Sequence, residues 1–228
     1  MPTAVTRIHL ALACLAFSAW AAAASLQVSV VDQHGQPLPD AVVTLRGASD
    51  PGVPAPARAV MDQRQQEFMP HVLAVRAGTS ISFPNSDNIR HQVYSFSAPK
   101  RFELRLYEGT PGAPLLFDKP GVVVLGCNIH DWMLGYIYVS DDPWFAVSDA
   151  KGQLSLDGLP AGHYRMSLWH PRGEGLLNQP GGEFDVASNG GQQTASIKVQ
   201  PPAADAAIAP APSVFGDAFG KALRESEK

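Results

Sequence analysis

Cysteine is scarce in this sequence. The 228 residues include only Cys14 and Cys127. Cys14 lies in an apolar run that follows Arg7 and ends in small residues at positions 22–24, a pattern typical of a secretory signal peptide over residues 1–24. Removal of that segment would leave Cys127 without a cysteine partner in a compartment that favours disulfides. The sequence therefore excludes an intramolecular disulfide in the mature chain and predicts that something else occupies or protects the Cys127 thiol.

Long apolar runs, basic charge and paired acids are also lacking. After residue 24 no run approaches the roughly 20 apolar residues that cross a bilayer, so we expect no membrane span. The formal net charge of −4 does not suit a nucleic-acid-binding surface. Asp131, Asp141 and Asp142 are scattered in loops and do not pair as a general acid and base. We therefore expect no nucleic-acid partner and no enzymatic activity.

Helical periodicity is missing between residues 26 and 199. Instead, short apolar runs such as LQVSVVD, GVVVLG and GYIYVS alternate with Gly, Pro, Asp and Asn, a spacing typical of β-sandwiches. Segments rich in Pro and Ala indicate loops or linkers at residues 48–59 and 200–213. The sequence thus predicts an all-β fold, followed by a Pro/Ala-rich linker and C-terminal tail over residues 200–228.

The residues that could carry chemistry are concentrated in GCNIHDWM, residues 126–133. Cys127, His130 and Met133 form a C-x2-H-x2-M pattern between two apolar runs, so they should share one tight loop between strands. A thiolate, an imidazole and a weak thioether, together with a second imidazole, are the ligands of a mononuclear electron-transfer copper site. His91 is the best candidate for that imidazole, because it ends the turn-rich segment FPNSDNIRH and begins the next apolar run.

Each of these residues also has a simpler interpretation. A lone cysteine in a β protein is often a small buried hydrophobe. His91 could be a turn residue whose ring is hydrogen-bonded, and Met133 could fill the core. The export signal, the shared loop and the spacing favour copper ligation over these alternatives. A binuclear copper centre would need a second cysteine, so we predict a single copper ion.

The segments PNSDNIRHQV and GVVVLGCNIHDWM resemble the cupredoxins, the small blue copper proteins, and among them the amicyanin and plastocyanin-like branch. The resemblance covers residues 61–140 and implies a Greek-key β-sandwich. It also implies a trigonal ligand set completed by a long axial ligand. The trigonal ligands would be His91, Cys127 and His130, and the axial ligand would be Met133.

The same resemblance implies a tether between the two ligand loops. Asn85 stands six positions before His91, where the family has an asparagine that hydrogen-bonds toward the cysteine loop. Directly after Cys127 the family usually has Thr or Ser, whereas this chain has Asn128. Asn85 and Asn128 are therefore expected to support the ligands from behind.

The rest of the chain resembles a second kind of module. LQVSVVDQHGQPLPDAVVTLRG and AVSDAKGQLSLDGLPAGHYRMSLWHP resemble the two halves of a carboxypeptidase-regulatory-like, transthyretin-type β-sandwich. The combination resembles periplasmic proteins labelled methylamine utilization proteins. It implies a discontinuous sandwich at residues 25–48 and 143–199, with a cupredoxin domain at residues 59–142 inserted into it or leaning on it.

These resemblances imply a periplasmic electron-transfer protein with one type 1 copper ion. Its partner would be a periplasmic redox protein, either a dehydrogenase or a c-type cytochrome, bound through a small, transient interface. The alternative is a periplasmic copper carrier or buffer, or a two-sandwich interaction module without a redox role. The sequence leaves the oligomeric state open.

Overall fold

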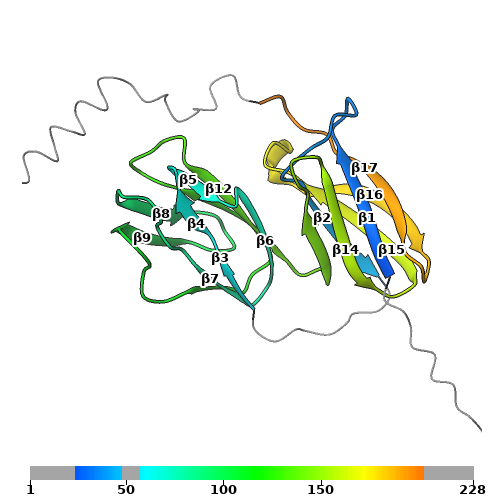
Figure 1. Ribbon diagram of the computed structural model, residues 1–228, viewed down its shortest axis with the longest axis horizontal. Helices are drawn as coiled ribbons and strands as arrows, with labels where there is room; N and C mark the ends of the chain where they lie inside the picture. Colours follow the sequence, from blue (N-terminus) through cyan, green and yellow to red (C-terminus); the bar gives the residue numbers. More distant parts are fainter. Residues whose placement is uncertain (1–23, 48–56, 203–228) are drawn as a thin grey trace, which may run out of the picture.

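The computed structural model describes residues 24–47 and 57–202 (Figure 1). Residues 1–23 of the predicted signal peptide, most of the linker at 48–59 and the tail from residue 203 lie outside the described residues. In the described part the chain forms seventeen strands and one short 3-10 helix, Glu174–Leu176. The predicted all-β class is therefore confirmed.

Two facing sheets make up one unit, which lies at the right in Figure 1. In β1 every second side chain is buried, because successive side chains of a strand point to opposite faces of its sheet. The residues that face inward from both sheets form one core, which includes Leu26, Val28, Leu45 and Leu168. The first sheet has the order β14 (Gln153–Leu159), β1 (Ala24–Val31), β17 (Gly191–Ser196), and the second has the order β13 (Trp144–Val147), β2 (Val42–Gly47), β15 (Gly162–Trp169), β16 (Gln179–Val186).

The strands between β2 and β13 form a second unit, at the left in Figure 1. Its core contains a group of three phenylalanine rings, Phe83, Phe102 and Phe117, with centroids 5.4 to 6.2 Å apart. The strands are β6 (Val72–Arg76), β12 (Leu134–Ser140), β11 (Gly121–Gly126), β8 (His91–Ser95) and β9 (Phe102–Tyr107) in one sheet, β10 (Leu115–Phe117), β7 (Thr79–Ser82) and β3 (Arg58–Val60) in another, and the hairpin β4 (Asp62–Arg64) and β5 (Glu67–Met69).

A small apolar cluster joins the two units. Trp169, at the end of β15, is fully buried and packs against Tyr136 and Tyr138 of β12, with ring centroids 5.8 and 5.6 Å away. Beside this cluster, His71 Nδ1 lies 2.8 Å from Asp40 Oδ2, so a polar contact also crosses the junction. The chain thus leaves the first unit after β2 and returns to it at β13. That the two units are separate folding domains stays a prediction.

Candidate metal centre

The sheet pairing brings the predicted ligands to one end of the second unit. Cys127 directly follows β11, and His91 is the first residue of β8. Because β8 and β11 are antiparallel neighbours, with Tyr94 opposite Gly126, the start of β8 lies beside the end of β11. A Cβ at Gly126 would lie 2.7 Å from Tyr94 Cζ, so only glycine fits directly before the cysteine without moving that ring.

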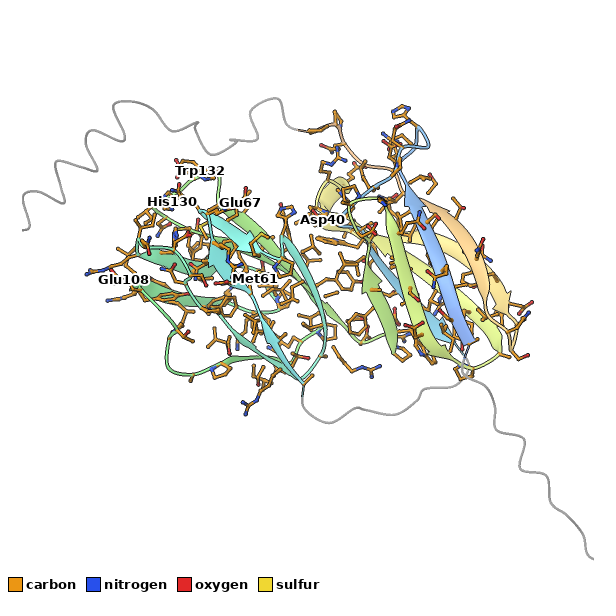
Figure 2. All side chains as sticks on the ribbon, viewed as in Figure 1. Asp40, Met61, Glu67, Glu108, His130 and Trp132 are labelled. Atoms are coloured by element: carbon orange, nitrogen blue, oxygen red, sulfur yellow. The ribbon has the colours of Figure 1, made fainter. Side chains whose placement is uncertain are left out.

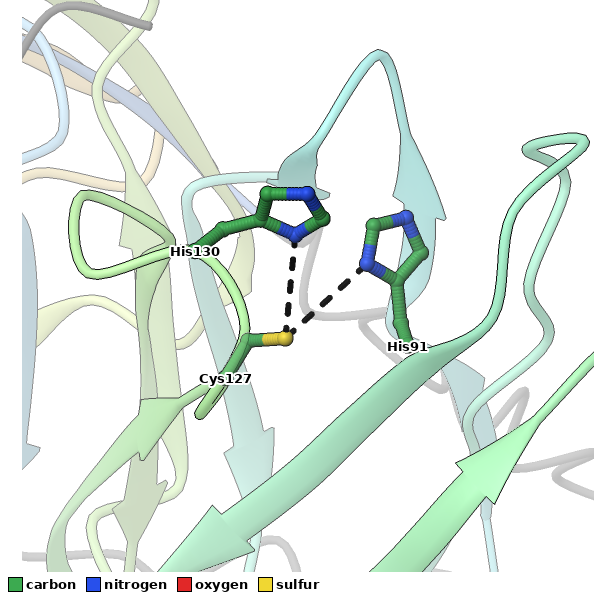
Figure 3. Close-up of side chains that lie close together, drawn as sticks. All are labelled: His91, Cys127 and His130. Carbon is green, nitrogen blue, oxygen red and sulfur yellow. Dashed lines mark hydrogen bonds between the residues drawn. The ribbon is translucent and has the colours of Figure 1, made fainter. Parts of the chain in front are cut away.

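The three strongest ligand candidates converge. Cys127 Sγ lies 3.9 Å from His91 Nδ1 and 3.9 Å from His130 Nδ1. One ligand atom from each residue lies within 4.8 Å of the others. Figure 3 shows both imidazole rings with a nitrogen directed at the sulfur. In the described residues, no other group of three His, Cys, Asp or Glu side chains is arranged in this way.

These separations fit a metal ion. An ion bonded to sulfur at about 2.3 Å and to nitrogen at about 2.0 Å holds the two atoms roughly 3.9 Å apart when the bonds open to about 130°. The thiol is buried, with 3% of Cys127 exposed, so the two neighbouring imidazoles decide which ion it can bind. A soft sulfur beside two imidazoles suits a transition metal better than a hard ion such as Ca²⁺.

Asp87 lies on the far side of the His91 ring and was not predicted. His91 is completely buried, and its Nε2 lies 2.8 Å from Asp87 Oδ2. An ionised carboxylate only accepts hydrogen bonds, so Nε2 carries the ring proton and Nδ1 keeps its lone pair toward Cys127. The D-x-x-x-H spacing within FPNSDNIRH is the sequence signal that could have identified this carboxylate.

The β4–β5 turn holds Asp87 in place. The backbone N–H groups of Gln65 and Gln66 donate to its two carboxylate oxygens, at 2.6 and 2.9 Å. Both glutamines have positive φ, +56° and +61°, a region that non-glycine residues rarely adopt. Burial by itself would raise the pKa of Asp87, but the hydrogen bonds from Gln66, His91 and Gln65 outweigh it and leave the pKa below its ordinary value.

His130 lies at the partly exposed edge of the site. Its ring centroid is 4.9 Å from that of His91 and 5.2 Å from that of Trp132. Figure 2 shows His130 and Trp132 together at one end of the second unit. Burial lowers the pKa of His130, the neighbouring His91 ring acts in the same direction, and Asp87 acts in the opposite direction. Neutral imidazole, the form that binds metals, is therefore favoured.

Met133 is buried in the same core as Cys127, with 1% of its surface exposed. Its backbone N–H donates to His130 O at 3.0 Å, which closes the ligand loop into a tight turn. This burial suits both interpretations of the residue, core filler and axial ligand. Its axial role stays a prediction.

The prediction for Asn85 was wrong in its direction. Asn85 Nδ2 donates to Ile89 O at 2.8 Å and to Tyr107 O at 2.9 Å, and its Oδ1 accepts from Asp87 N–H at 3.0 Å. All these partners belong to the His91 loop or to β9. Both amide hydrogens of Asn85 are therefore already used by these partners. Asn128 is exposed, and in the described part of the chain it forms no hydrogen bond with Asn85. Asn85 therefore supports the His91 loop and does not tie it to the cysteine loop.

Comparison with known proteins finds similar solved structures only at low identity and low TM-score. No family model and no curated protein matches the chain. A purple cupredoxin from Nitrosopumilus maritimus is 21% identical, over 36% of this chain and 99% of that chain, with a TM-score of 0.33. A mutant of amicyanin in its reduced Cu(I) form is 18% identical, over 43% of this chain and 98% of that chain, with a TM-score of 0.33.

A third similar structure belongs to an enzyme. The copper-containing nitrite reductase from Thermus scotoductus SA-01 is 24% identical, over 50% of this chain and 28% of that chain, with a TM-score of 0.35. TM-scores this low carry no weight in assigning a function.

Proposed function

We propose that this chain binds one copper ion through His91, Cys127, His130 and Met133 and transfers single electrons. The observation that carries the proposal is the approach of two Nδ1 atoms to 3.9 Å from one buried sulfur. Thiolate, two imidazoles and a weak thioether are the donors of blue copper electron-transfer sites. Bound there, copper would alternate between Cu(I) and Cu(II).

The chain's own residues favour electron transfer over metal exchange. His91 and Cys127 are 0% and 3% exposed, so solvent and competing ligands do not reach them directly. Hydrogen bonds from Gln65, Gln66 and Asn85 hold the His91 loop, which limits movement of the ring when the charge at the site changes. A copper carrier needs ligands that open to release the ion.

We further propose that a redox partner docks beside His130, the most exposed of the three converging ligands. Ile129, inside the loop from Cys127 to Met133, and Leu134, directly after it, are each 47% exposed, and a small apolar surface of this kind suits a transient contact. Met133 is buried and does not contribute to that surface. The partner class stays a periplasmic dehydrogenase or a c-type cytochrome, and the periplasmic location follows from the predicted signal peptide.

Visible spectroscopy tests the proposal. Copper-loaded, oxidised protein should show the intense thiolate-to-Cu(II) band of a blue copper site, and Cys127→Ser should lose it. His163→Gln is the matched control, since His163 is an exposed histidine of the other unit and its loss should leave the band unchanged. Wild-type protein that binds copper but stays colourless after oxidation would favour the carrier, and protein that binds no copper would favour an interaction module.

A further inference from the structure

The His91 ring has one nitrogen for the metal and one for a carboxylate. Nδ1 lies 3.9 Å from Cys127 Sγ, while Nε2 lies 2.8 Å from Asp87 Oδ2. The ring is completely buried, so water does not replace the carboxylate as a partner. The His91 ring therefore lies between the Asp87 carboxylate and the metal site, and it contacts both.

We propose that Asp87 is a positioning residue that holds His91 in the Nε2–H tautomer and makes Nδ1 a stronger donor toward Cu(II) than toward Cu(I). This inference rests on the proposed function. A carboxylate hydrogen-bonded to the outer nitrogen of a ligating histidine fixes the ring's tautomer and raises its basicity. A negative charge behind the ring stabilises the more highly charged ion more, so Asp87 lowers the reduction potential of the site.

Hydrogen bonds from neighbouring segments hold Asp87 in this position. Its side chain is 14% exposed, and four hydrogen bonds converge on the residue. Gln65 and Gln66 donate to the carboxylate from a turn whose two residues have positive φ, and Asn85 Oδ1 accepts the Asp87 backbone N–H at 3.0 Å. Asn85 thus acts on His91 through Asp87, which gives the asparagine a role different from the one predicted.

The hydrogen bonds of the β4–β5 turn also restrict the rotation of the Asp87 carboxylate. Gln65 N–H binds Oδ1 at 2.6 Å and Gln66 N–H binds Oδ2 at 2.9 Å, so each oxygen has a fixed donor. The same Oδ2 then accepts from His91 Nε2. Since both ends of the carboxylate are held, His91 cannot flip its ring without breaking a buried hydrogen bond.

The test compares Asp87→Asn with Asp118→Asn, which removes the same charge from an exposed loop. Competition titrations with Cu(II) and Cu(I) chelators should show that Asp87→Asn weakens Cu(II) binding by about 10- to 100-fold. Cu(I) binding should weaken less, so the reduction potential should rise by about 59 mV for each tenfold difference between the two. Asp87→Glu should recover part of the loss, and Asp118→Asn should match wild type.

A second measurement needs no metal. In copper-free wild-type protein, ¹⁵N NMR of the histidine rings should show His91 as the Nε2–H tautomer, with a slowly exchanging ring proton. An Nδ1–H tautomer would overturn the inference whether or not the variants fold, and so would equal Cu(II) and Cu(I) losses in Asp87→Asn. If wild-type protein binds no copper, the proposed function fails, and the tautomer still decides whether Asp87 positions His91.

Discussion

We expect His170 to make the stability of this protein depend on pH. The residue follows β15 and is 4% exposed. Its Nε2 lies 3.1 Å from Pro39 O, which only accepts, and its Nδ1 accepts from Arg172 N–H at 2.9 Å. Both ring nitrogens are therefore satisfied by the neutral form, and a proton on Nδ1 would break the bond to Arg172. Pro39 precedes Asp40, whose carboxylate contacts His71 across the junction of the two units.

The size of the effect follows from the shift of the pKa. Burial is the largest cause that lowers the pKa of His170 to about 4; Arg172 and His71 act in the same direction, while the bond to Pro39 O and the Asp40 charge oppose them. An unfolded histidine titrates near 6.5, so the unfolded chain binds the proton first as the pH falls. The part of the folding stability that depends on neutral His170 is therefore complete above pH 6.5 and is lost as the pH falls from about 6.5 to 4. By pH 5 the loss reaches about 2 kcal/mol.

Urea unfolding of the copper-free protein at pH 7.5, 6, 5 and 4.5 measures this loss. The His170→Gln variant removes the titrating group, so it should be less stable at pH 7.5 but should lose less stability on acidification. The difference between the two pH profiles isolates His170 from the carboxylates that also titrate at the lower end. Parallel profiles for wild type and variant from pH 7.5 to 5 would refute the reasoning.

Two further substitutions test the packing around the site. In Gly135→Ala the new Cβ would lie 2.7 Å from Phe68 Cβ, which is buried under β12, so the free energy of unfolding should fall by about 1–3 kcal/mol. Gly112→Ala, where no atom lies within 4 Å, is its control, and equal unfolding curves for the two would contradict the packing described. Tyr107→Phe removes the hydroxyl that donates to a backbone carbonyl at 2.7 Å and accepts from fully buried Gln63, and should cost about 1–3 kcal/mol in chemical denaturation. A neutral result there would mean that water replaces the lost partner.

The loop from Cys127 to Met133 could be predicted from the sequence because the residues that define it lie close together in the chain. Cys127 and His130 lie three residues apart between two apolar runs, so a short turn brings them together whatever surrounds it. His91 was harder, since it lies 36 residues before Cys127. Its selection depended on the turn-rich segment before it and on the resemblance to cupredoxins, and the convergence of the two segments needed the pairing of β8 with β11.

Asp87 and Asn85 show where sequence reasoning failed. Asn85 was assigned a partner in the cysteine loop, but its amide hydrogens reach Ile89 O and Tyr107 O first. Two of the hydrogen bonds to Asp87 come from Gln65 and Gln66, 22 and 21 residues earlier in the chain. Hydrogen-bond partners this far apart depend on how a hairpin lies against a loop, which no local pattern encodes.

The sequence by itself determined the all-β class, the alternation that buries one face of β1 and the thiol and imidazole groups available near Cys127. These properties depend on residue type and on short spacings, which are written directly in the chain. Only the tertiary structure decided which nitrogen of His91 faces the sulfur, which carboxylate lies behind the ring and how Trp169 joins the two units. Those outcomes depend on distances between segments remote in sequence, and such distances are set by the packing of whole sheets.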